Sequence, residues 1–244
     1  MPRFCANLTL LYQELPLAAR FDAAASGGFD AVELLWPDEA NETPRELAGL
    51  AQDSGVDFTL IDTPRGDTWG NGAHLNQKEA FRHELMQSIE TAEILNASHV
   101  HIMAGLNGDL TVLQENLAHA CDLVPKQSFI IEPISPQAIQ GYTLNSFKAV
   151  VAILETINRP NAGLLLDTFH AMNMGLDPLK LWQDHATLIR HVQVSSHPAR
   201  NEPEEGYNFQ AFFDQLDRDG YNGDVSGEYH PAGKTSDRLG WLKK

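Results

Sequence analysis

The chain contains only two cysteines, Cys5 and Cys121, among its 244 residues, and they show no paired spacing. Neither a disulfide framework nor a thiolate zinc site is indicated. The sequence also lacks an uninterrupted apolar run of roughly 18 residues, and its first apolar stretch is too short for a signal peptide. We therefore expect a reduced, cytoplasmic protein without a membrane-spanning helix.

Positive charge is also scarce, with 17 basic against 33 acidic residues and a formal net charge of -16. Such a chain repels nucleic acid and anionic membrane surfaces, so we expect neither as a partner. A small anionic metabolite remains compatible, because one arginine or helix N-terminus acts over a shorter distance than the net field. A homo-oligomer is compatible with the same composition.

Eight short apolar runs alternate with stretches of helical spacing. The runs span residues 3–10, 31–36, 57–62, 99–103, 129–132, 163–167, 191–194 and 224–228, and the helical stretches span 15–28, 43–54, 77–95, 110–124, 143–157, 178–184 and 209–216. Buried parallel strands are continuous apolar runs, and parallel pairing requires helix-length crossovers. The pattern predicts an α/β fold, a closed (β/α)8 TIM barrel with one domain over residues 1–244. An open doubly wound sheet is the alternative, although no Gly-rich nucleotide loop follows a strand.

Four oxygen-bearing side chains stand at the ends of the later strands: Glu132, Asp167, Gln193 and Glu228. The carboxyl ends of barrel strands meet at one face, so we expect these four to converge there. Carboxylate and amide oxygens favour Mg²⁺ or Mn²⁺ as the bound metal. Each residue alone has an ordinary alternative: solvated strand ends for the glutamates, a helix N-cap for Asp167 and a hydrogen-bonded barrel residue for Gln193.

Two further residues lie beside this set. His170 follows Asp167 in the segment DTFH, where a turn would point both side chains inward. A carboxylate with an imidazole suits a divalent cation or a proton relay, whereas a packed histidine is the alternative. Arg200 lies in the irregular stretch 195–207, which, like 64–76, would cover the active face of a barrel. It could bind a substrate carboxylate through two hydrogen bonds, or simply be an exposed surface residue.

The paired glutamates indicate a class of chemistry. Carboxylates beside a bound cation can take a proton from the carbon next to a carbonyl and return it to the neighbouring carbon, while the ion stabilises the enediolate. This is isomerisation of the aldose–ketose type.

Several segments carry a resemblance to a known family. They are RFCANLTLLY, GFDAVELLWP, FIIEPIS, LLLDTFHAM, HVQVSSHPARNEP, GYNGDVSGEYHP and LGWL, between residues 3 and 242. In combination they resemble the hydroxypyruvate isomerase family and its 2-oxo-tetronate isomerase relatives, on a xylose isomerase-like barrel. The resemblance implies that Glu132 and Glu228 are catalytic and contact the metal, that Asp167 and Gln193 complete the ligand set, and that His170 and Arg200 contact substrate.

Three loops depart from the pattern of that family. Ala73 stands where the family has an arginine, Ser195 and Ser196 replace Ala-Asp, and Tyr207 directly follows Gly206 where Gly-Glu is usual. These departures leave open whether the substrate is the usual 2-oxo acid, another sugar acid or a neutral ketose.

The expected function is isomerisation of a small 2-oxo hydroxy acid to its aldehyde isomer, of the hydroxypyruvate/tartronate semialdehyde or 2-oxo-tetronate type. The alternatives are a ketose 3-epimerase on the same barrel and a non-catalytic sugar-acid binding barrel. A DNA-repair endonuclease is disfavoured, because the chain is strongly acidic and has no dense histidine cluster.

Overall fold

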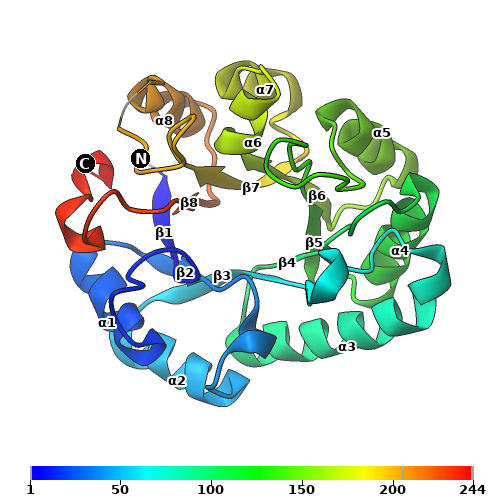
Figure 1. Ribbon diagram of the computed structural model, residues 1–244, viewed down its shortest axis with the longest axis horizontal. Coiled ribbons are helices and arrows are strands. Elements are labelled where there is room, and N and C mark those ends of the chain that lie inside the picture. Colours follow the sequence, from blue (N-terminus) through cyan, green and yellow to red (C-terminus); the bar gives the residue numbers. More distant parts are fainter. Residues whose placement is uncertain (1, 205, 243–244) are drawn as a thin grey trace.

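Eight parallel strands close into a barrel, and the helices surround it (Figure 1). The computed structural model describes residues 2–204 and 206–242. Each strand pairs with the next one in the chain, and β8 pairs with β1. The predicted TIM barrel is confirmed. The strands are β1 (Arg3–Asn7), β2 (Ala31–Glu33), β3 (Asp57–Asp62), β4 (His99–His101), β5 (Ser128–Ile131), β6 (Ala162–Asp167), β7 (Ile189–Val194) and β8 (Asp224–Gly227).

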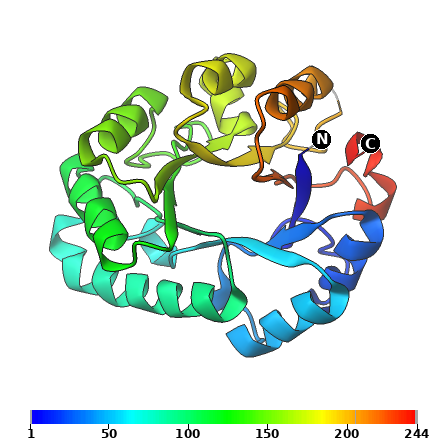
Figure 2. The same ribbon diagram turned by 180° about the vertical axis from the view of Figure 1, so that it is seen from behind.

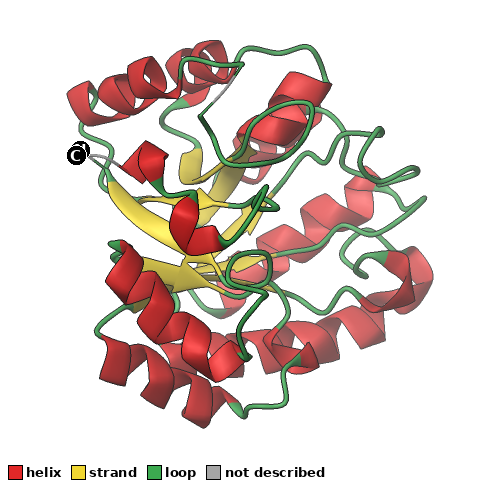
Figure 3. Ribbon diagram, turned by 60° about the vertical axis from the view of Figure 1, so that its left-hand side comes forward, coloured by secondary structure: helices red, strands yellow, loops and turns green. Residues whose placement is uncertain are grey.

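The helices form an outer layer, seen from behind in Figure 2 and from the side in Figure 3. They connect each strand to the next, as right-handed parallel crossovers require. The helices are α1 (Leu17–Gly27), α2 (Pro44–Ser54), α3 (Lys78–Leu95), α4 (Leu110–Leu123), α5 (Phe147–Ile157), α6 (Thr168–Asn173), α7 (Pro178–His185) and α8 (Phe209–Arg218). None of the described helices has the length and apolarity needed to cross a membrane.

Most differences from the sequence prediction lie where strands leave the barrel. The first strand was expected to continue to residue 10 but ends at Asn7, whose side-chain oxygen accepts a hydrogen bond from the Thr9 backbone and turns the chain. The helix expected from residue 143 begins at Phe147, because the Thr143 hydroxyl bonds to the Gly105 carbonyl. The segment DTFH, expected as a turn, forms the short helix α6.

Two hydrophobic cores hold the barrel together. The larger core lies between strands and helices and includes the first strand, where the Phe4 ring packs 5.3 Å from the Trp241 ring at the other end of the chain. The smaller core consists of Leu35, Leu60, Ile130 and Leu165, with Trp36 packed against it.

Strand alternation then places the polar site directly beyond the small core. Successive side chains on a strand point to opposite faces, so residues two apart share a face. Leu60, Ile130 and Leu165 are followed two positions later by Asp62, Glu132 and Asp167, all of them buried. The apolar residues therefore close the barrel beneath a layer of carboxylates.

The start of α2 gives a test of local stability. Thr43 and Glu46 form a capping box, in which the Thr43 hydroxyl accepts from the Glu46 backbone and the Glu46 carboxylate accepts from the Thr43 backbone. Thr43→Ala should lower the free energy of unfolding by about 1 kcal/mol in urea denaturation, because the Glu46 backbone N–H loses its side-chain acceptor. Thr156→Ala, at an exposed position in the last turn of α5, is the control and should cause no loss, because alanine favours helix. Equal losses in both variants would contradict the capping argument.

Candidate functional site

A cavity of about 250 Å³ opens at the carboxyl ends of the strands. Both polar side chains and apolar or aromatic side chains line it. Its polar lining consists of Asp62, His101, Glu132, His170, Gln193, Arg200, Glu228 and His230. Five of the six side chains expected from the sequence therefore face one space. The sixth, Asp167, is 1% exposed and contacts two of the others.

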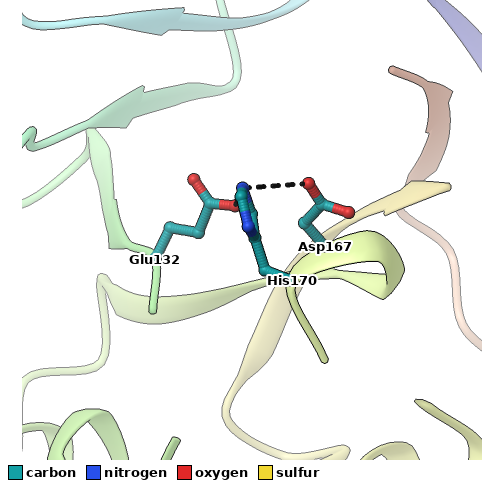
Figure 4. A group of neighbouring side chains, drawn as sticks. All are labelled: Glu132, Asp167 and His170. Carbon is teal, nitrogen blue, oxygen red and sulfur yellow. Dashed lines mark ion pairs between the residues drawn. The ribbon is translucent and has the colours of Figure 1, made fainter. Parts of the chain in front are cut away.

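Glu132, Asp167 and His170 form the tightest group in the cavity. Figure 4 shows the His170 imidazole between the two carboxylates. Its Nε2 lies 3.6 Å from Glu132 Oε1 and 3.5 Å from Asp167 Oδ2. One ligand atom from each residue lies within 4.8 Å of the others. The two carboxylates could therefore share a single ion, with the His170 imidazole beside it.

Asp167 has two roles at once. Its Oδ1 accepts a hydrogen bond from the Phe169 backbone at 2.7 Å and thereby caps the N-terminus of α6. Its Oδ2 faces His170 and Arg200. Asp167 can therefore be a helix N-cap and a site residue at the same time. The hydrogen bond of the cap fixes Oδ1, and Oδ2 then points into the site. The same cap starts the helix that carries His170.

Arg200 joins two carboxylates from different strands. Its Nη2 donates to Glu228 Oε2 at 2.7 Å and lies 3.2 Å from Asp167 Oδ2. Its guanidinium also lies over the Phe169 ring, at 4.8 Å from the centroid. The Nε atom is buried without a hydrogen-bond partner, and the bonds to the two carboxylates use Nη2 alone, so other guanidinium N–H groups remain for a ligand.

The loop after β7 holds Arg200 in place. The Arg200 backbone donates to the Ser196 carbonyl at 3.0 Å, and the Ser196 hydroxyl accepts from the Asn201 backbone at 3.0 Å. Arg200 itself has a positive φ of 54°, which is uncommon for a residue other than glycine. Ser196, one of the departures from the family pattern, therefore supports the position of this arginine. Tyr207, another departure, bonds to Asp177 and the Leu179 backbone instead and does not line the cavity.

Gln193 is held by a buried network around Glu33, which the sequence analysis did not single out. Glu33 Oε1 accepts from Gln193 Nε2 at 2.8 Å and from Asn7 Nδ2 at 2.7 Å, and Glu33 Oε2 lies 2.8 Å from His191 Nε2. Because the amide nitrogen of Gln193 is engaged by Glu33, its carbonyl oxygen is the atom left to act as a ligand in the cavity. Glu33 stands at the end of β2, and this position was the signal available in the sequence.

Burial dominates the electrostatics of the acidic group. Loss of solvent raises the pKa of Glu132 well above its ordinary value, and the charges of Asp167 and Glu228 raise it further. Burial also raises the pKa of Asp167, although Arg200 opposes this effect. The pKa of His170 is lowered, first by burial and then by the charge of Arg200, so its imidazole is neutral.

Partners reverse the effect of burial at two other residues. Burial alone would raise the pKa of Glu33, but the hydrogen bond and charge of His191, with the bond from Gln193, lower it below its ordinary value. Burial would lower the pKa of Arg200, but Glu228, Asp167 and Glu132 raise it, so the guanidinium stays charged. The site therefore contains a permanent cation among several carboxylates.

The residues present fit a divalent cation. Glu132 Oε1 is buried and has no hydrogen-bond partner, and the possible ligand atoms around it include the carboxylate oxygens of Asp167. The His170 Nδ1 accepts from the Ser135 backbone, so its Nε2 carries the hydrogen and lies beside these oxygens. Such oxygens suit Mg²⁺ or Mn²⁺. The structure groups His170 with Glu132 and Asp167, whereas Glu228 reaches the group through Arg200. Among the described residues, this is the group of His, Cys, Asp and Glu side chains close enough to share an ion.

This chain is similar to known proteins over almost its whole length. The family model described as xylose isomerase-like TIM barrel matches residues 21–244. The 2-oxo-tetronate isomerase of Haemophilus influenzae is 34% identical, over 100% of this chain and 99% of that protein. The Homo sapiens protein named "Putative hydroxypyruvate isomerase" is 36% identical, over 99% of this chain and 94% of that protein.

Solved structures show the same fold. A Brucella melitensis protein, described as an AP endonuclease of family 2, has a TM-score of 0.95 at 31% identity and covers 99% of this chain and 98% of its own. The 3-keto-D-glucoside 4-epimerase of E. coli has a TM-score of 0.80 at 16% identity, over 99% of this chain and 98% of its own. At 16% identity, the similarity to the E. coli epimerase shows a shared fold and nothing more.

The raised pKa of Glu132 predicts an unusual stability effect. The folded protein binds the Glu132 proton more tightly than the unfolded chain does, so this residue reduces stability as pH rises above its ordinary pKa of 4.5. In chelator-treated protein, Glu132→Gln should raise the free energy of unfolding at pH 7.5, because glutamine removes the cost of holding an ionised carboxylate in this buried position. The gain should shrink towards pH 4.5. Glu155→Gln, on an exposed face of α5, is the control and should change stability by less than about 0.5 kcal/mol. A loss of stability in Glu132→Gln at both pH values would contradict this account.

Proposed function

Because the chain belongs to the xylose isomerase-like TIM barrel family, we propose that it is an isomerase that interconverts a small 2-oxo hydroxy acid and its aldehyde isomer. The observation that carries the proposal is the position of two glutamates from separate strands, Glu132 after β5 and Glu228 after β8, in the lining of one cavity. The names of full-length relatives at 34 and 36% identity support the same class of reaction.

The size of the cavity supports a small substrate. Its volume of about 250 Å³ is below the range of about 300–1,000 Å³ that is usual for drug-sized ligands. A three- or four-carbon acid is a better match than a larger sugar. A nucleic-acid substrate is disfavoured by the formal net charge of -16, whatever the description of the Brucella melitensis protein.

The proposed roles follow from the charges and contacts. One glutamate takes a proton from the carbon beside the carbonyl, and the other returns a proton to the neighbouring carbon. The high pKa of Glu132 suits proton transfer at neutral pH, because a carboxyl with a pKa nearer the working pH can both give and accept a proton. Arg200, which lines the cavity, binds the substrate carboxylate through guanidinium N–H groups that Asp167 and Glu228 do not occupy, and His170 donates from Nε2 to oxygens in the site.

A divalent cation, Mg²⁺ or Mn²⁺, belongs to the proposal. Glu132, Asp167, Gln193 and Glu228 would hold it, with His170 beside them. The ion would supply positive charge at the oxygens of the enediolate. Asp167 and Glu228 now share the guanidinium of Arg200, so these two carboxylates already lie close enough to bind one cation between them.

Replacement of either glutamate tests the reaction. Glu132→Gln and Glu228→Gln should each lower the conversion of hydroxypyruvate and 2-oxo-tetronates by about 10²- to 10⁴-fold, the usual contribution of a general acid or base. Proton NMR in D₂O would follow both conversion and deuterium uptake at carbon, and Glu155→Gln should behave as wild type. Ordinary turnover in either variant would rule out the paired roles.

The same measurement separates the alternatives. A ketose 3-epimerase would invert a carbon of a ketose without forming an aldehyde, and a binding protein without catalysis would take up no deuterium. Wild-type protein that shows neither conversion nor exchange with these acids would contradict the proposed function.

Metal binding can be tested without an activity assay. After removal of metal by a chelator, calorimetric titration with Mn²⁺ should show one site in the wild-type protein. Asp167→Asn should weaken this binding by about tenfold or more, since asparagine keeps the helix cap but loses the ligand charge. Asp177→Asn is a matched control, because Asp177 caps α7 in the same way but lies outside the cavity. Equal Mn²⁺ affinity in the wild type and both variants would exclude the metal site.

A further inference from the structure

Asp62 and His101 also line the cavity, and neither has a role in the reaction proposed above. Asp62 ends β3 and His101 ends β4, and the two residues are direct partners in the parallel pairing of these strands. His101 Nδ1 lies 3.0 Å from Asp62 Oδ1, and both side chains are almost fully buried. The second ring nitrogen, Nε2, is buried without a partner, and His101 lines the cavity together with Glu132 and Glu228.

The carboxylate determines which nitrogen of the ring carries the hydrogen. An ionised carboxylate only accepts hydrogen bonds, so the Nδ1 of His101 must donate to Asp62. Burial raises the pKa of Asp62 to about 6, against the opposing effect of His101, so the carboxylate is mostly ionised at pH 7.5. In the neutral ring, Nε2 then presents its lone pair. A buried acceptor without a donor is unfavourable, and a substrate hydroxyl would satisfy it.

No other histidine of the described cavity lining is arranged in this way. The Nδ1 of His170 is occupied by Ser135, whose hydroxyl and backbone nitrogen lie 3.1 and 3.3 Å away. Its Nε2 lies between the carboxylates of Glu132 and Asp167. His230 also lines the cavity, but it is exposed to solvent. Within the described lining of the cavity, His101 is therefore the buried imidazole with a ring nitrogen that has no partner.

The proposed reaction needs more proton transfers than the two glutamates supply. In hydroxypyruvate, C3 loses a proton and C2 gains one, and these are the transfers at carbon. In addition, the hydroxyl on C3 must lose its proton as it becomes an aldehyde, and the carbonyl oxygen on C2 must gain one as it becomes a hydroxyl. A group that contacts oxygen is required for this second exchange.

We propose that His101 carries the proton between the two substrate oxygens and that Asp62 positions it for this transfer. This inference rests on the proposed isomerase function. The neutral Nε2 takes the proton from the C3 hydroxyl as C3 loses its hydrogen to a glutamate. The imidazolium, paired with Asp62, then donates that proton to the oxygen on C2, as the second glutamate protonates C2. The histidine then returns to its starting state. One proton passed back through solvent, from the glutamate that accepted the C3 hydrogen to the glutamate that protonated C2, resets the pair, so atoms and charge balance.

The test separates proton transfer at carbon from transfer at oxygen. Hydroxypyruvate is supplied in D₂O, and proton NMR follows both the exchange of the C3 hydrogens and the formation of tartronate semialdehyde. His101→Gln should retain most of the enzyme-dependent C3 exchange, while net conversion falls about 100-fold or more. His119→Gln, on the exposed face of α4, is the matched control and should retain both rates.

A second variant keeps the ring and changes its tautomer. In Asp62→Asn, the amide can donate to Nδ1, which moves the hydrogen to Nε2 and removes the lone pair from the cavity. Conversion should fall while exchange persists, even if His101→Gln does not fold. Wild-type conversion in either folded variant, or a parallel loss of exchange and conversion in both, would overturn the role of His101. A wild-type protein without exchange or conversion would instead disprove the underlying isomerase function.

Discussion

Negative charge gathers at the buried carboxyl ends of the strands, and the arrangement of the site follows from how that charge is balanced. Glu33, Asp62, Glu132, Asp167 and Glu228 each have 7% or less of their surface exposed. Two unit charges 4 Å apart interact by about 4 kcal/mol at an effective dielectric constant of about 20, so unpaired like charges at this density would oppose folding. The structure meets this cost with separate partners: histidine and amide groups for Glu33, one histidine for Asp62, and the guanidinium of Arg200 for Asp167 and Glu228.

Glu132 differs from the other four carboxylates, because one of its oxygens is buried without a hydrogen-bond partner. Its Oε1 has no hydrogen-bond partner, the nearest nitrogen is the neutral imidazole of His170 at 3.6 Å, and its pKa is raised well above the ordinary range. A barrel core could place an apolar side chain at this position with less strain, as Ile130 shows two residues earlier on the same face. Residues that reduce stability in this way are expected where binding or catalysis requires them. The carboxylate with the poorest structural justification is thus one of the two that the family resemblance marks as catalytic.

The sequence predicted the barrel and the ends of its later strands because both depend on local patterns. Continuous apolar runs with helix-length crossovers leave few other folds, and a polar residue after such a run lies at the carboxyl face. The same rule would have identified Asp62 in DFTLID and His101 in HVH, had it been applied to the earlier strands. Other features had no local signal. Six residues are too few for helical periodicity to reveal α6, and the position of Arg200 depends on a positive φ that arginine does not indicate.

An anionic substrate adds a further negative charge to this cavity. Arg200 is the sole arginine or lysine in the described cavity lining, and two carboxylates already share it. Without an added cation, the raised pKa values of Glu132 and Asp167 favour bound protons, which lower the local charge. A divalent cation would compete with those protons for the same oxygens, so its binding would release protons and weaken as pH falls. Bound protons or a bound metal can each lower the local negative charge, but only the metal leaves Glu132 ionised to accept a proton from carbon. Under the proposed function, this is the physical reason that an acidic protein with a crowded acidic cavity can act on an acid.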